Sequence, residues 1–205
     1  MPRLSADQQT ARRNRLLDAA ERCFARAGFH AATMADIARA ARVSAGAAYT
    51  YFGSKEALIA GIAARDRARL AQDFAAIADA PDFAEALEAC ARFHLIEQPT
   101  HKRLLWLQLG AESSRNPAVA RSHREVDRVV RISFRAALDR QIAAGRIAPD
   151  MPRDRLVAAL RLVGDGLFHR RAIEPKADPE ALLGAAMSLV RLALAPSARR
   201  RTARR

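Results

Sequence analysis

Apolar residues recur at helical spacing along most of the chain, and short polar or glycine-containing breaks separate the repeats. Gly28 ends a first repeat over 10–27, after an arm of residues 1–9, and two short repeats follow between Thr33 and Lys55. Longer repeats cover 56–78, 82–97, 102–111, 117–144, 154–173 and 179–195. We find no sustained alternation of apolar and polar residues of the kind that indicates a sheet. The pattern therefore predicts an all-α protein.

The two short repeats predict a helix-turn-helix. Thr33 and Ser44 are each placed as the N-cap of a helix of about two turns, and Arg42-Val43 leaves room only for a tight turn. Two such helices form the motif whose second helix enters the DNA major groove. The outward residues of the second helix are small or hydroxylated, which favours close approach to a duplex. They are Ser44, Ala45, Gly46, Ala47, Tyr49, Thr50 and Tyr51.

This region resembles the N-terminal domain of TetR-family regulators. The resemblance is carried by Ala19-Ala20, Phe24, Gly28-Phe29, Thr33, Ile37-Ala38, Val43-Ser44, Gly46, Tyr49, Phe52, Lys55 and Ala57-Leu58. It implies a homodimer that binds double-stranded operator DNA and is released by a small-molecule effector. The remaining helices match the family in order, and the segment around Trp106 and Asn116-Pro117 is similar to the choline-responsive BetI branch. The alternative is an all-α domain with a fortuitous helix-turn-helix pattern.

The candidate DNA-contacting residues are Thr33, Ala35, Arg42, Ser44, Ala45, Gly46, Ala47, Tyr49, Thr50, Tyr51 and Lys55. The resemblance implies phosphate contacts for Thr33, Tyr49 and Lys55. Ala35 and Ala45–Ala47 match positions that often read base edges, yet none of these side chains can form a hydrogen bond. We therefore expect specificity to come from Tyr51, Thr50, methyl contacts and DNA shape.

Arg42 departs from the family, which often has glycine in this turn. If φ of Arg42 is positive, the backbone carries a strain of ~1 kcal/mol. Its guanidinium group would lie near the duplex. Two interpretations remain: the group contacts a phosphate, or it is only exposed to solvent.

The C-terminal helices are expected to bind an effector and to form a dimer. The candidate effector pocket consists of Phe74, Phe93, Trp106, His123, Val130 and Phe134. Each of these is also typical of an ordinary helical core. The last two helices are too apolar for the outer layer of a monomer, which predicts a four-helix dimer interface. Its candidate residues are Leu160, Val163, Gly164, Leu167, Leu182, Ala186, Leu189 and Val190.

Basic residues are concentrated near the two ends of the chain. The 35 Lys and Arg and 22 Asp and Glu give a net charge of +13. Residues 1–55 contribute +5 and the five arginines of 199–205 another +5, which leaves +3 for the rest. This distribution favours binding to a polyanion through counterion release, although an arginine-rich composition is also typical of a GC-rich genome. We thus predict a DNA-binding domain (1–55), a ligand-binding and dimerisation domain (56–198) and a disordered basic tail (199–205).

Other classes of function are disfavoured. Cys23 and Cys90 are expected to be reduced core thiols, and no segment has the ~20 apolar residues of a membrane span. We therefore expect a cytoplasmic protein without a membrane partner. The histidines show neither an HxxxH motif nor a Cys/His ligand spacing, and no phosphate-binding glycine loop is present. We expect no enzyme activity, no cofactor and no metal.

The sequence therefore predicts a transcriptional repressor released from its operator by a small molecule. Two alternatives remain at this stage: an activator of the same family, and a small-molecule binding protein whose helix-turn-helix is vestigial.

Overall fold

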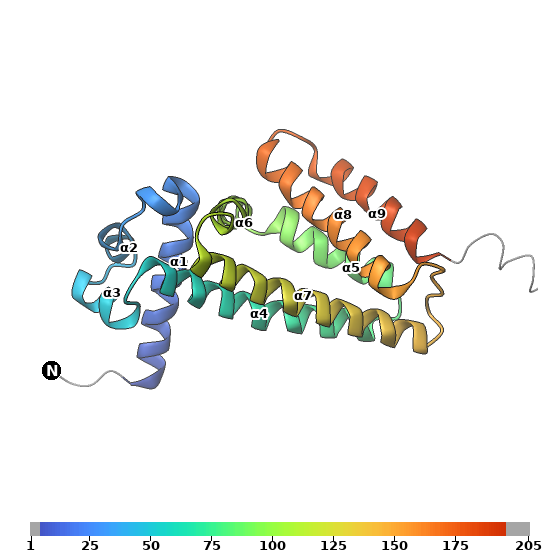
Figure 1. Cartoon of the computed structure of the whole chain (residues 1–205), viewed down its shortest axis with the longest axis horizontal. Coiled ribbons are helices and arrows are strands. Elements are labelled where there is room, and N and C mark those ends of the chain that lie inside the picture. Colours follow the sequence, from blue (N-terminus) through green and yellow to red (C-terminus); the bar gives the residue numbers. More distant parts are fainter. Residues whose placement is uncertain (1–4, 196–205) are drawn as a thin grey trace, which may run out of the picture. The chain divides into compact units, whose positions relative to one another are not determined.

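The computed structural model describes residues 5–195, and the contacts divide the chain into two compact units (Figure 1). Unit 1 consists of Met1–Asp66 with Thr100–Val126, and unit 2 of Arg67–Pro99 with Asp127–Arg205. The regular elements of the described residues are all helices, which confirms the predicted all-α class. Residues 1–4 and 196–205, and with them the predicted basic tail, lie outside the described part.

Unit 1 contains α1 (Ala6–Ala31), α2 (Met34–Ala40), α3 (Ala45–Tyr51), α6 (Thr100–Ser113) and the first parts of α4 (Lys55–Asp79) and α7 (Pro117–Ala143). The predicted arm over residues 1–9 is wrong in its second half, because α1 already begins at Ala6. The Ser5 hydroxyl accepts from the Gln8 N–H at 3.2 Å, and the Gln8 side chain accepts from the Ser5 N–H at 3.0 Å. This reciprocal capping box fixes the start of the helix.

The core of unit 1 is built around α1. Leu16, Leu17 and Phe24 are buried to 1% exposure or less and pack against α2, α3 and α4. Gly61 of α4 lies against this core: a Cβ added to it would be 2.9 Å from both Leu17 Cδ2 and Phe52 Cε1. A residue with a side chain would push these two groups away, so glycine is what allows α4 to pass so close to α1.

A buried carboxylate joins α1 to α4 and α6. Glu21 is only 1% exposed, and its Oε1 accepts from Arg65 Nη2 at 2.7 Å and from Lys102 Nζ at 2.5 Å. Arg65 also donates to Asp18 Oδ1 at 2.7 Å. Because a buried charge is tolerated only when it is paired, these contacts determine how α4 and α6 lie on α1.

Unit 2 contains α5 (Phe83–Arg92), the π-helix η1 (Phe93–Glu97), α8 (Arg153–Ile173), α9 (Pro179–Leu194) and the remaining parts of α4 and α7. Figure 1 shows α8 and α9 side by side, and α5 also packs on α9. Among residues 5–195, no helix combines the length and apolar character that crossing a bilayer requires. The largest side chains fully buried in this unit are Phe83, Leu95, Leu138, Leu156 and Leu183.

Two features of unit 2 were not predicted. The side-chain amide of Gln141, on α7, is buried and donates to the carbonyl oxygens of Ala78 and Ala80 at 2.9 Å each, which satisfies the carbonyls at the end of α4. The expected single helix over 82–97 instead changes from α to π at Phe93, where the Gln98 N–H donates to the Phe93 carbonyl oxygen at 2.9 Å.

The Glu21 network gives a test of unit 1. We expect Glu21→Gln to lower the free energy of unfolding by about 2 kcal/mol, because the amide has the same shape but leaves Arg65 and Lys102 without their charged acceptor. Urea denaturation of the full chain measures this change. The exposed control Glu97→Gln should stay within about 0.5 kcal/mol of the unsubstituted protein. Equal stability of the two variants would contradict the proposed role of Glu21.

Candidate nucleic-acid interface

Thr33 fixes the beginning of α2. Its Oγ1 accepts from the Asp36 N–H at 3.1 Å and donates to Asp36 Oδ2 at 2.6 Å, and Oδ2 accepts from the Thr33 N–H at 3.3 Å. These hydrogen bonds from Thr33 lower the pKa of Asp36. The structure thus confirms Thr33 as an N-cap, and it shows that the hydroxyl proton is already used within the protein.

The turn between α2 and α3 depends on an unusual backbone conformation. Among residues 5–195, Arg42 is the only non-glycine residue with a positive φ, which is +55°. The Arg42 N–H donates to the Arg39 carbonyl oxygen at 3.1 Å, and the Val43 N–H donates to that of Ala38 at 3.0 Å. Ser44 then begins α3, accepting from the Ala47 N–H at 3.2 Å. The predicted second N-cap is confirmed, and the condition under which Arg42 carries backbone strain, a positive φ, is met.

One side of α3 holds the helix on the core and the other is open. Ala48 and Phe52 are buried, and Tyr51 is half-buried against the same core. On the outer side Tyr49 is 54% exposed, and a Cβ added to Gly46 would meet no atom within 4 Å. Ala35, Ala45 and Thr50 are exposed as well, and Ala47 is half-buried. The outer face therefore presents methyl groups, backbone and one phenol ring.

Two further predicted contacts, like Thr33 and Ser44, have partners within the protein. The Thr50 hydroxyl donates to the Gly46 carbonyl oxygen at 2.9 Å. Lys55 Nζ donates to the carbonyl oxygens of Phe29 and His30 at 2.6 and 3.1 Å, and it lies 4.6 Å from the centroid of the Phe29 ring. Lys55 therefore binds the start of α4 to the end of α1, a role that the sequence did not indicate. An ammonium group has three donors, so one remains for a phosphate.

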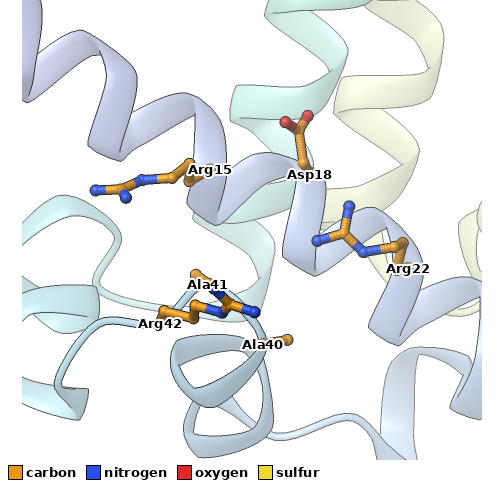
Figure 2. Close-up of a pocket in the computed structure, with 6 residues that line it drawn as sticks. All are labelled: Arg15, Asp18, Arg22, Ala40, Ala41 and Arg42. Atoms are coloured by element: carbon orange, nitrogen blue, oxygen red, sulfur yellow. The ribbon is translucent and has the colours of Figure 1, made fainter.

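A basic pocket lies where α1 meets the α2–α3 turn. Figure 2 shows the side chains of Arg15, Arg22 and Arg42 around it, together with Asp18, Ala40 and Ala41. The Asp18 carboxylate is paired with Arg65, so the three guanidinium groups make the pocket suitable for an anion. Arg15 and Arg22 are not among the predicted DNA-contacting residues. Their spacing of seven residues, which puts them on one helical face, is the signal that could have found them.

The candidate effector residues are divided between the units. Trp106 and His123 belong to unit 1, and the other four belong to unit 2. In unit 2 the rings of Phe74 and Phe134 lie 5.3 Å apart, and the Phe93 ring lies under the Arg69 guanidinium. The half-buried Val130 completes the set. The effector pocket remains a prediction.

The candidate dimer residues differ in exposure. Leu160, Leu167, Ala186 and Val190 are buried in the core of unit 2, whereas Leu189 is 57% exposed. Val163, Gly164 and Leu182 are half-buried. Two strongly exposed leucines were missed: Leu162 of α8 (72%) and Leu192 of α9 (75%). Both faces of these helices are apolar, so periodicity could not show which face turns inward.

These features define a class of protein. An exposed second helix that begins at its own N-cap, packs on a three-helix core and lies close to a basic pocket is a helix-turn-helix DNA-binding domain.

The comparisons with known proteins agree with that class. Residues 16–62 match the family model "Bacterial regulatory proteins, tetR family", and residues 83–195 match "BetI-type transcriptional repressor, C-terminal". The HTH-type transcriptional repressor Rv1474c of Mycobacterium tuberculosis is 34% identical over 176 residues, covering 84% of this chain and 88% of that protein. The HTH-type transcriptional repressor AcnR of Corynebacterium glutamicum is 28% identical over 172 residues, covering 82% and 86%. The structure of Salmonella enterica GusR matches with a TM-score of 0.77 and 25% identity, covering 94% of this chain and 99% of that one.

The chain belongs to the TetR family of bacterial transcriptional regulators, and its C-terminal part is of the BetI type. The predicted family and its BetI-like branch are both confirmed.

The turn gives the next test. We expect Arg42→Gly to be more stable than Arg42→Ala by about 1 kcal/mol, because glycine adopts a positive φ without the steric cost of a Cβ atom. Both variants lose the guanidinium group, so the difference between them isolates the backbone. Denaturant unfolding of the two proteins side by side measures it. A more stable alanine variant would show that the turn relaxes to negative φ.

Proposed function

We propose that the protein is a homodimeric transcriptional repressor that binds operator DNA through α3 and is released by a small-molecule effector. The observation that carries this proposal is the exposed, uncharged outer face of α3, on a helix that Ser44 caps and the core of unit 1 supports. The two relatives compared above are both named transcriptional repressors, which supports repression as the function of this chain.

DNA reading would depend on shape more than on hydrogen bonds to bases. The outer face of α3 has alanine methyl groups at Ala45 and Ala47 and bare backbone at Gly46, which suit thymine methyls and close approach. Without a guanine-reading side chain on these positions, sequence preference would follow groove width and deformability. Arg15, Arg22 and Arg42 would supply phosphate contacts and the salt dependence that accompanies them.

A dimer would place two copies of α3 on successive major grooves, about one DNA turn or ~34 Å apart. Leu162, Leu189 and Leu192 support this part of the proposal, because strongly exposed leucines on adjacent helices are unusual in a monomer. A Cβ added to Gly164 or Gly184 would meet no atom within 4 Å, so these glycines are not required by packing within the subunit. They would permit close approach of a second subunit.

An effector would act on unit 2, which contains most of the BetI-type match over residues 83–195. The aromatic residues Phe74, Phe93 and Phe134 are the proposed contacts there, and they suit an apolar or cationic small molecule. A compound that abolishes operator binding by the full chain would identify the effector. If operator binding activates the adjacent gene in a reporter strain, the activator alternative is correct.

Tyr49 gives the sharpest test of DNA binding, because it is exposed and its substitution leaves the core unchanged. We expect Tyr49→Phe to weaken operator binding about tenfold through loss of one hydroxyl–phosphate hydrogen bond, and Tyr49→Ala to weaken it further. Fluorescence anisotropy on a duplex selected from a random library measures both. Lys55→Ala is a poorer probe, since it also removes the contacts to Phe29 and His30.

A scrambled duplex is the comparison for this measurement. Because a phosphate contact does not depend on sequence, Tyr49→Phe should weaken binding to the scrambled duplex by a similar factor and leave the ratio of selected to scrambled affinity unchanged. If the unsubstituted protein shows no salt-sensitive preference for any duplex, the repressor interpretation is wrong. The alternative, a small-molecule binding protein with a vestigial helix-turn-helix, is then the better one.

The dimer is tested separately. We expect Leu192→Glu to shift the protein from dimer to folded monomer at micromolar concentration, because a carboxylate would be buried in the apolar interface. Ile132→Glu is the matched control, since Ile132 is also exposed (53%) but lies on α7. Sedimentation velocity with circular dichroism distinguishes dissociation from unfolding. Dimers of both variants, or a monomeric unsubstituted protein, would contradict the proposed interface.

A further inference from the structure

Three side chains with metal-ligating atoms meet in unit 2. Asp73 lies on α4, Cys90 on α5 and His94 on the π-helix η1. A carboxylate oxygen, the thiol sulfur and an imidazole nitrogen of these residues all lie within 4.8 Å of one another. His94 Nε2 is 3.0 Å from Asp73 Oδ2. All three side chains are half-buried, so a small ion from solvent can reach them.

The change from α-helix to π-helix takes place inside this cluster. Cys90 and His94 are four residues apart, and the π-helix begins at Phe93, between them. A π-helix is rare and is frequently found at functional sites. The Phe93 ring packs edge-on to the His94 imidazole at 5.1 Å, and the Arg69 guanidinium lies 4.4 Å from the same ring. These contacts restrict the imidazole to the side of α4 that carries Asp73.

The chemistry of the three groups indicates which ligand would bind. A thiolate, an imidazole and a carboxylate together suit a borderline-soft divalent ion, above all Zn²⁺, whereas Mg²⁺ and Ca²⁺ take oxygen ligands. Metal–ligand bonds of about 2.0–2.3 Å place the ligand atoms of a tetrahedral site roughly 3–4 Å apart. The observed separations require only small side-chain rotations to reach that geometry.

We propose that Asp73, Cys90 and His94 form a binding site for Zn²⁺ or a chemically similar divalent transition-metal ion. On binding, the Cys90 thiol loses its proton to solvent and the thiolate becomes a ligand. The hydrogen bond between His94 Nε2 and Asp73 Oδ2 is replaced by a metal bond to each of these atoms: the Nε2 proton leaves to solvent, and a proton on Nδ1 keeps the ligating imidazole neutral. Three protein ligands leave a fourth position for water or a small anion, and the positive charge of Arg69 favours an anion there. The ion would join α4 to α5 and η1.

A nucleophilic or redox role is a weaker interpretation of the same cluster. Burial, together with the Asp73 carboxylate, raises the pKa of Cys90 to about 11. The thiol is therefore protonated at neutral pH and is a poor nucleophile.

Cobalt binding tests the site directly. The full chain, reduced, tag-free and freed of metal by a chelator, is titrated with Co²⁺ and the absorption spectrum is recorded. We expect one equivalent per protomer to produce a thiolate-to-cobalt charge-transfer band in the near ultraviolet, which Zn²⁺ then abolishes. Cys90→Ser should lose the band, and Cys23→Ser, which removes the other thiol of the chain, should retain it. His94→Gln and Asp73→Asn should each weaken Co²⁺ binding at least tenfold.

Thermal unfolding gives a second readout. Saturating Zn²⁺ should raise the Tm of the unsubstituted protein and of Cys23→Ser, but not that of His94→Gln, because only an ion that binds the folded state stabilises it. Absence of the charge-transfer band in the folded unsubstituted protein would overturn the proposal, as would a band that survives Cys90→Ser. If Cys90→Ser does not fold, unchanged Co²⁺ affinity of His94→Gln would overturn it instead. No DNA is present in either measurement, so the result is independent of the proposed repressor function.

Discussion

Paired buried carboxylates help to hold unit 1 together, and Glu21 is the one that joins α1 to α4 and α6. Glu21 lies inside the unit with Arg65 of α4 and Lys102 of α6 as its partners, and Leu105 and Val119 belong to the same core cluster as α1. The DNA-binding helices therefore share their core with segments that follow them in sequence. Lys55, where the predicted DNA-binding domain ends, lies within this packed unit and not at its edge. The division at residue 55 stays a prediction about function, while the contacts define a larger structural unit.

This packing explains how α3, a helix without charged residues, could serve as the proposed DNA-reading surface. Buried Ala48 and Phe52 hold α3 on the core, and its caps and the Arg42 turn are satisfied within the protein, so its outer face needs few charges of its own. The positive groups lie beside it, in the pocket around Arg15 and Arg22. In the proposed mode of DNA binding, phosphate attraction and base contact would come from different elements, which agrees with positioning by phosphates and reading by shape.

The sequence predicted the helix ends well where they depend on residues that are close together in the chain. The caps at Thr33 and Ser44 follow from single residues and their neighbours. The helix break predicted at Gly28 is present as a kink inside α1, where φ is +77°. The prediction failed where partners are distant along the chain: Lys55 binds carbonyls 25 and 26 residues earlier, and Gln141 binds carbonyls more than 60 residues earlier. The π-helix was missed because apolar periodicity does not reveal one extra residue per turn. Cys90 and His94 were overlooked because their third partner, Asp73, is on another helix.

α4 is the element through which the proposed sites would influence each other. The same helix contains Lys55, which binds the end of α1, and Asp73 of the proposed metal site. Continuity alone does not couple two sites. A ligand shifts an equilibrium between two states only by the difference in its affinity for them. An ion that joins α4 to α5 would therefore change operator affinity only if the DNA-bound and free forms hold Asp73 at different distances from Cys90 and His94. Metal binding and operator release are separate properties, and measuring Co²⁺ affinity with and without operator would determine their coupling, since linkage makes the effect reciprocal.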